Sequence, residues 1–339
     1  MRQTKPTKMT DPFRTIVDLP TGLPPITHAG KVMLLGSCFA QNMGERLLAE
    51  KFRVELNPFG ILYNPLSIAE ALGELADGRE YASDDLFCYQ GLWHSPMHHG
   101  SFSAATVEEA LDGINSRLRQ AHQAMPELDW LILTFGTAYV YEQKASEHIV
   151  ANCHKQPERE FNRRLLSVEE IVATYTPLLQ RLTRENKNLK ILCTVSPIRH
   201  LRDGMHAGQL SKSTLLLAIE QLQQAFADRL FYFPAYEIVI DELRDYRFYA
   251  DDMTHPTPLA VEYIWKRLGE TFFNAETRKL LAEIEEIAKG LAHKPFHPEQ
   301  EAYQLFLGQI VLKIRRLIEK YPYLDFQKET EVCHIRLNP

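Results

Sequence analysis

The sequence has no long apolar run. Apolar stretches such as residues 130–135 are much shorter than the roughly 20 residues that cross a bilayer. The basic start, residues 1–8, is followed by a polar stretch with prolines, where a signal peptide has about 7 to 15 apolar residues. We therefore expect a cytoplasmic protein that has no membrane partner.

The sequence also lacks a strongly basic segment. Its 38 Lys and Arg residues stand against 44 Asp and Glu residues, a net charge of -6, and only residues 313–316 concentrate the positive side chains. Proteins that bind nucleic acids or anionic membranes carry a basic patch. The charge distribution therefore predicts no nucleic-acid partner.

Cysteines are few and are not paired in sequence. The five are Cys38, Cys88, Cys153, Cys193 and Cys333. An odd number without short paired spacings fits neither a disulfide framework nor a four-cysteine zinc site. We expect most of them to be inert thiols in a reducing compartment. Cys38 is the exception, for the reasons given below.

Strand-like and helix-like segments alternate along most of the chain. Short apolar runs at 31–35, 129–135, 190–195 and 230–233 predict strands, and amphipathic stretches between them begin at the capping residues Asn64, Thr106, Ser167 and Ser211. This alternation predicts an α/β three-layer sandwich, with a mainly parallel sheet covered by helices on both faces. Ligands bind such sheets at the carboxyl ends of the strands.

The composition changes after Pro256. Residues 259–291 and 299–320 have the periodicity of long amphipathic helices, and no further strand pattern follows. We divide the chain into an N-terminal extension (1–29), the α/β domain (30–273) and a C-terminal helical appendage (274–339). The appendage either packs on the sheet or serves a partner.

The turn Gly36-Ser37-Cys38 places a nucleophilic side chain between a strand and a helix. The first turn of a helix has free N–H groups and a dipole that favour an anion there. Both Ser37 and Cys38 could use this position. The alternative is an ordinary turn in which a serine caps the helix and the cysteine is buried.

Asp252 and His255 lie three residues apart, just before an expected helix. A histidine that acts as general base for a hydroxyl or thiol needs a carboxylate to orient it, and this spacing can supply one. The alternative is a solvated aspartate beside a histidine that caps the helix.

Several segments together resemble one known family. They are Gly-Ser-Cys-Phe-Ala at 36–40 and the segments 57–65, 134–138, 152–155, 194–200 and 246–255. Over about residues 30–270 the chain resembles the GSCFA family, which is grouped with the SGNH hydrolases. The resemblance implies an SGNH or flavodoxin-like fold and an esterase or acyltransferase with a Ser/Cys-His-Asp triad.

The resemblance also implies the partners and the remaining site residues. The substrate would be a small-molecule or glycan ester, such as an O-acyl carbohydrate, and neither a cofactor nor a metal is required. Gly60 and the pair Gly136-Thr137 would supply donors to the oxyanion. Asn152 could replace a missing donor.

The chain departs from the SGNH pattern at two places. The usual Gly-Asp-Ser is Gly36-Ser37-Cys38 here, so strict register places Cys38 at the nucleophile position, and a shift of one residue would give Ser37 instead. The usual Gly-x-Asn has no asparagine after Gly136. Losing one oxyanion donor lowers the rate roughly 10²- to 10³-fold.

Other polar residues near the strand ends have two interpretations each. His200 either contacts the substrate or is a core histidine, and Arg199 either binds a substrate anion or forms a structural ion pair. His94, His98 and His99 more plausibly line the crevice than bind a metal, because no carboxylate or cysteine stands beside them at a helical offset. Residues 152–155 form either a crevice loop or a solvated connection, and we favour the connection.

Two other functions fit the same sequence. The altered nucleophile turn and the absent asparagine would suit a binding protein that keeps the crevice without the chemistry. A redox role for Cys38 would need Cys88, Cys153 or Cys193 to approach it through the fold. We rank the hydrolase or acyltransferase first and the redox role last.

Overall fold

A parallel sheet forms the centre of the protein. The structure, a computed structural model, describes residues 14–293 and 301–337, and within these ranges a five-stranded parallel sheet has the order β10-β9-β5-β1-β2. The strands are β1 (Lys31–Gly36), β2 (Arg53–Leu56), β5 (Leu128–Phe135), β9 (Lys190–Val195) and β10 (Leu230–Tyr232). Counted along the chain, this is the order 2-1-3-4-5 of flavodoxin-like sheets.

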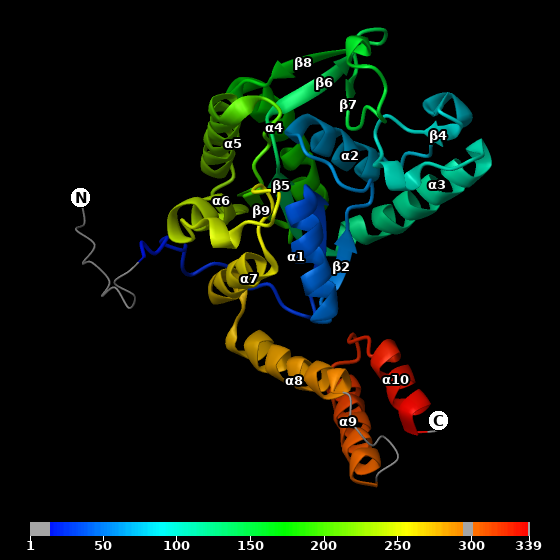
Figure 1. The fold of residues 1–339 in the computed structure, drawn as a ribbon, viewed down its shortest axis with the longest axis vertical. Helices are drawn as coiled ribbons and strands as arrows, with labels where there is room; N and C mark the ends of the chain where they lie inside the picture. Colours follow the sequence, from blue (N-terminus) through cyan, green and yellow to red (C-terminus); the bar gives the residue numbers. More distant parts are fainter. Residues whose placement is uncertain (1–13, 294–300, 338–339) are drawn as a thin grey trace.

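Helices cover both faces of this sheet (Figure 1). The helices α1 (Cys38–Ala49) and α7 (Pro258–Phe272) share one apolar core with Val32, Trp130 and Phe231 of the sheet. A second core, on the opposite face, joins the sheet to α2 (Pro65–Asp77), α3 (Val107–Ala124), α4 (Val168–Glu185) and α5 (Gly204–Ala225). The predicted fold class, an α/β sandwich with a mainly parallel sheet, is therefore confirmed.

Most helix starts follow the predicted caps. The side chains of Asn64, Thr106 and Ser167 each accept a hydrogen bond from a backbone N–H in the first turn of α2, α3 and α4. The start predicted for α5 is wrong, because this helix begins at Gly204 and not at Ser211. Its N-cap residue Asp203 makes no side-chain capping bond, so the usual signal is absent there.

Short strands outside the main sheet were not predicted. They are β3 (Phe87–Tyr89) with β4 (Leu92–His94), and the antiparallel sheet of β6 (Tyr139–Gln143), β7 (Ile149–Val150) and β8 (Phe161–Leu165). The second group directly follows the carboxyl end of β5. A further short helix, α6 (Ala235–Glu237), follows β10.

The C-terminal helices have a core of their own. This core joins α8 (Ala275–Ala292), α9 (Glu301–Lys320) and α10 (Gln327–Leu337), and Figure 1 shows these helices at the end of the molecule opposite β6 and β8. The single helix predicted over 259–291 is wrong, because Asn274 caps a new helix by accepting from the Thr277 N–H at 2.8 Å. The predicted start of the next helix, at 299, lies outside the described residues.

The flanking segments pack against the α/β domain. In the predicted N-terminal extension, residues 1–13 lie outside the described residues, whereas Ile26 is fully buried and its N–H donates to the Phe272 carbonyl at 2.8 Å. At the other end, the Lys51 ammonium pairs with Glu329 of α10 at 2.7 Å. In the part of the chain that the structure describes, no helix is long and apolar enough to span a membrane.

Candidate active site

The site lies where neighbouring strands of the sheet lead to helices on opposite faces. In the 2-1-3-4-5 order this reversal occurs between β1 and β5, and ligand crevices open at such a point. A side chain on Gly36, at the end of β1, would lie 2.3 Å from the Thr134 carbonyl oxygen of β5. Glycine at this position therefore lets the Ser37-Cys38 turn lie directly against β5.

The two candidate nucleophiles have different environments. Ser37 is 1% exposed, and its Oγ caps α1 by accepting from the Phe39 N–H at 3.3 Å. Cys38 is the first residue of α1 and is half-buried, and its Sγ lies 3.4 Å from the Tyr63 hydroxyl. The serine is thus engaged in the fold, whereas the thiol is partly accessible.

Asp252 and His255 form a hydrogen-bonded pair in the loop before α7. The Asp252 Oδ2 lies 2.5 Å from the His255 Nδ1, and its Oδ1 accepts from the N–H groups of His255 and Thr254. These backbone bonds, with the bond to the imidazole, hold the pKa of Asp252 well below its usual range. Thr257, and not His255, caps α7. The carboxylate therefore orients the ring and leaves Nε2 for another partner.

The loop after β9 brings His200 close to the nucleophile turn and also to this pair. The Arg199 N–H donates to the Thr254 carbonyl at 3.4 Å. The Tyr63 ring stands edge-on to the His200 ring, with centroids 5.7 Å apart. Burial, together with smaller effects of the Lys212, Arg163 and His255 charges, lowers the pKa of His200 to about 4. His200 is therefore neutral near pH 7 and lies in the crevice.

Gly136, directly after β5, lies close to both Ser37 and His200. A Cβ on Gly136 would lie 3.4 Å from both the His200 Nε2 and the Ser37 Cβ, and 3.1 Å from the Tyr63 carbonyl oxygen. The predicted residues at 37–38, 136 and 200 therefore meet at one point of the crevice.

The expected backbone donors to the oxyanion are already engaged. The Gly60 N–H donates to the Asn57 carbonyl at 2.8 Å. The N–H groups of Gly136 and Thr137 both donate to the Tyr63 carbonyl, at 2.8 Å and 3.1 Å. The Thr137 hydroxyl accepts from the Tyr139 N–H. The donor role expected for these glycines and for Thr137 finds no support in this geometry.

Asn152 contacts the loop that contains Pro96, between His94 and His98. Its N–H donates to the Pro96 carbonyl at 3.1 Å, and its Oδ1 accepts from the His154 N–H. The His154 side chain is buried, its Nε2 lies 2.7 Å from the Ser95 carbonyl oxygen, and its ring lies 4.4 Å from that of His94. The interpretation of 152–155 as a solvated connection therefore holds only for the exposed Lys155.

His98 is a core residue. It is fully buried, its ring stacks on Phe59 at 4.5 Å, and its Nδ1 lies 2.9 Å from the Ser95 hydroxyl. Burial, with a smaller effect of the nearby Arg79 charge, lowers the pKa of His98 to about 3. Within the described ranges, no group of three His, Cys, Asp or Glu side chains is arranged to hold a metal ion.

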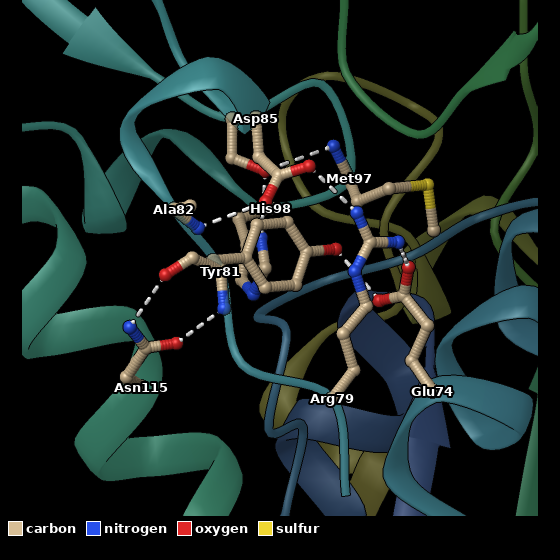
Figure 2. Close-up of polar contacts among 9 residues, drawn as sticks. Glu74, Arg79, Tyr81, Ala82, Asp85, Met97, His98 and Asn115 are labelled. Atoms are coloured by element: carbon tan, nitrogen blue, oxygen red, sulfur yellow. Dashed lines mark hydrogen bonds and ion pairs between the residues drawn. The ribbon is translucent and has the colours of Figure 1, made fainter. Parts of the chain in front are cut away.

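A partly buried polar network lies beside His98 (Figure 2). The Tyr81 hydroxyl donates to Glu74 at 2.6 Å, and the Arg79 guanidinium bridges Glu74 and Asp85. The Tyr81 ring stands edge-on to His98, with centroids 4.9 Å apart. The polar side chains beside His98 therefore bind one another and have a structural role.

Arg199 has no carboxylate partner among the described residues. Its guanidinium contacts the Met205 sulfur at 3.8 Å. Burial raises the pKa values of the nearby Tyr236 and Tyr249, and the positive charge of Arg199 offsets part of this rise. The interpretation as a structural ion pair is therefore not supported. Its role in binding a substrate anion stays a prediction.

A hollow lies elsewhere on the surface. It measures about 450 Å³, and its lining includes Glu70 of α2, Glu142 of β6 and Thr174 of α4. None of the predicted site residues lines it. We therefore do not place the reaction there.

Two residues of the crevice were missed. Tyr63, whose hydroxyl reaches Cys38, lies inside a segment that was recognised only by its resemblance. Lys212 of α5 is buried, and its ammonium donates to the carbonyls of Gly136 at 2.7 Å and Ser196 at 2.6 Å. Burial lowers the pKa of Lys212 to about 7. A lysine on the apolar side of this helix was the available signal.

Comparison with known proteins gives a family match. The sequence model of the GSCFA family matches residues 31–268, and the model of the GSCFA domain protein C-terminal domain matches residues 284–339. No curated protein matches the chain. Among solved structures, an acetyl xylan esterase (Est2A) from the rumen bacterium Butyrivibrio proteoclasticus matches 72% of this chain and 66% of its own, with 10% identity and a TM-score of 0.34. That likeness is too low to inform on the site.

Proposed function

Because the chain belongs to the GSCFA family, we propose that it is an esterase or acyltransferase with Cys38 as nucleophile and the Asp252–His255 pair as general base. One observation carries the proposal. A partly accessible thiol begins α1 at the crevice of the sheet, and a hydrogen-bonded Asp-His pair lies in a loop whose Thr254 carbonyl accepts from the Arg199 N–H after β9. The substrate class is a small-molecule or glycan ester.

The proposed reaction proceeds through an acyl-enzyme. His255 removes the proton of the Cys38 thiol, and the thiolate attacks the acyl carbon while the carbonyl π electrons move to the oxygen. The tetrahedral intermediate collapses as the ester C–O bond breaks, and the leaving alkoxide takes the proton from His255. Water, or an acceptor hydroxyl in a transferase, then attacks the thioester while His255 again takes the proton. The C–S bond breaks to release the acid or the new ester, and the Cys38 thiolate takes the proton back from His255. The chain needs no cofactor for these steps.

Cys38 is preferred to Ser37 as the nucleophile. The Ser37 Oγ is buried and already accepts from the helix N-terminus, whereas the Cys38 side chain is partly accessible. A thiolate at this position gains from the N–H groups and the dipole of α1. The register of the SGNH pattern leads to the same choice.

A second candidate function is ligand binding without catalysis. The observation that favours it is the engagement of the N–H groups of Gly60, Gly136 and Thr137 in the fold. A redox role is weaker, because burial raises the pKa of Cys153 to about 11 and that of Cys193 to about 12, which disfavours both thiolates.

Hydrolysis of p-nitrophenyl acetate by four proteins tests the proposal. Compared with the wild type, we expect Cys38→Ala to abolish hydrolysis and His255→Gln to lower it roughly 10²- to 10⁴-fold. Ser37→Ala should keep the activity but lose about 1 kcal/mol of unfolding free energy, because it removes the N-cap.

In parallel with the hydrolysis rates, we would measure how fast iodoacetamide labels Cys38, using mass spectrometry. The proposal requires rapid labelling in the wild type that slows in His255→Gln. If the wild type hydrolyses no ester and Cys38 resists labelling, ligand binding is the better explanation. If Ser37→Ala and not Cys38→Ala abolishes hydrolysis, the nucleophile is Ser37.

A further inference from the structure

The reaction proposed above needs donors that the usual backbone groups do not supply. The carbonyl oxygen gains a full negative charge in the tetrahedral intermediate, and active sites stabilise it with preorganised hydrogen-bond donors. The N–H groups of Gly60, Gly136 and Thr137 all donate to carbonyls of the protein itself. These three N–H groups are therefore not free to bind the oxyanion, and side chains beside Cys38 are the candidates to replace them.

Tyr63 is held firmly beside the nucleophile. The N–H of its neighbour Leu62 donates to the Gly36 carbonyl at 3.0 Å, and the Tyr63 carbonyl accepts from two N–H groups at the end of β5. The next residue, Asn64, caps α2. The segment is thus bound to the ends of β1 and β5 and to the start of a helix. The Tyr63 hydroxyl lies 3.4 Å from the Cys38 sulfur, so it is within reach of an oxygen on a carbon bonded to that sulfur.

The protonation state of Tyr63 suits a donor. Burial, together with the neighbouring Cys38, raises the pKa of the Tyr63 hydroxyl well above its ordinary value. The hydroxyl therefore keeps its proton throughout the range in which proteins work.

His200 presents a second buried polar atom to the same place. Its Nε2 has no hydrogen-bond partner among the described residues, although the atom is shielded from solvent. A buried nitrogen without a partner costs about 1–3 kcal/mol of stability, so such atoms call for an explanation. The Nε2 faces Gly136, beside Ser37 and Tyr63, where a substrate carbonyl would enter.

We infer that the Tyr63 hydroxyl and the His200 Nε2–H form the oxyanion-binding site of this protein, in place of the backbone donors of Gly60 and Gly136. The inference rests on the proposed function and names two further catalytic residues for it. In this arrangement His200 is neutral and donates from its Nε2–H tautomer. The carbonyl oxygen moves between the two donors as the Cys38 sulfur bonds to the carbon.

Tyr63→Phe and His200→Leu remove one donor each, and Tyr175→Phe is the matched control. Tyr175 also loses a buried hydroxyl, which donates to the Pro65 carbonyl at 2.8 Å outside the crevice. With p-nitrophenyl acetate, we expect kcat to fall roughly 10²- to 10³-fold in both site variants, with KM changed less than about threefold. His200→Gln, which keeps a side-chain N–H, should recover part of the loss.

A second measurement does not depend on turnover. Butyraldehyde adds to the Cys38 thiolate to form a hemithioacetal, whose oxygen occupies the oxyanion position, and this adduct slows labelling of Cys38 by iodoacetamide. The aldehyde concentration that halves labelling should rise at least about tenfold in Tyr63→Phe and His200→Leu, but not in Tyr175→Phe. The labelling rate without aldehyde should stay within about threefold of the wild-type rate.

The outcomes separate this inference from the proposed function. If the wild type hydrolyses no ester but aldehyde protection weakens in both site variants, the proposed function fails and the oxyanion site stands. Equal protection in all variants, or kcat within about threefold of the wild type in both site variants, overturns the inference. A parallel loss of hydrolysis and of labelling without aldehyde also overturns it, because Tyr63 and His200 would then act on the thiol. A Cys38 that no reagent labels contradicts both proposals.

Discussion

The buried Lys212 predicts an unusual dependence of stability on pH. Its pKa is lowered in the folded protein from an ordinary value of 10.5 to about 7, chiefly by burial and then by the charge of Arg199. Between these two pH values the unfolded chain holds a proton that the folded protein does not. The unfolding free energy therefore rises with pH in this window, and the gain is lost as the pH falls toward 7.

The size of the effect follows from the shift. One proton corresponds to about 1.4 kcal/mol for each pH unit, so the whole window is worth about 5 kcal/mol. This value is an upper limit, because the bonds from the Lys212 ammonium to the carbonyls of Gly136 and Ser196, at 2.7 Å and 2.6 Å, favour the charged form.

Lys212→Met removes the charge while keeping the length of the side chain. Urea unfolding of both proteins between pH 7 and 9.5 should show a steeper rise for the wild type, by up to about 1.4 kcal/mol for each pH unit. Lys279→Met, on the exposed side of α8, is the matched control and should follow the wild type. A difference between wild type and Lys212→Met that stays constant within about 0.5 kcal/mol over this range would refute the reasoning.

Two further changes test the packing of the site and of the core. Gly136→Ala places a methyl group 3.1 Å from the Tyr63 carbonyl oxygen and 3.4 Å from the His200 Nε2, so we expect a loss of about 1–3 kcal/mol in urea unfolding and slower ester hydrolysis. An unchanged rate would show that these groups tolerate displacement. Burial lowers the pKa values of His28 and His98 to about 4 and about 3, so stability should be complete above pH 6.5 and decrease as the pH falls toward 4. Urea unfolding of His98→Gln should show a shallower decrease than the wild type, and parallel curves would contradict the assignment.

The parts of the fold that could be predicted are those with a local cause. β1, β5, β9 and β10 are apolar runs buried on both faces, and most helices begin at side chains that cap them within three residues. β2 was missed because Arg53–Leu56 is short, charged and half-exposed, and it is a strand only because it pairs with β1. The β6–β8 sheet likewise depends on contacts between segments.

The same distinction applies to the candidate site. The nucleophile turn and the Asp252–His255 pair are visible in sequence, because each is a short segment whose spacing determines its geometry. Tyr63 gave no such signal, because its position depends on where its segment docks across two strand ends. The donors expected from the family pattern lack support for the same reason, since only the folded chain shows that their N–H groups are engaged.

One residue, Gly136, connects these missed residues. The carbonyl of Gly136 accepts from the Lys212 ammonium, and the N–H of Gly136 donates to the carbonyl of Tyr63. Lys212 therefore fixes the end of β5, and β5 in turn fixes the tyrosine whose hydroxyl reaches Cys38. This connection gives a physical reason for a charged side chain to stay buried in α5 without a carboxylate partner in the described part of the chain. Lys212 does not touch the nucleophile. Because it acts through Gly136 and Tyr63, we regard it as a positioning residue.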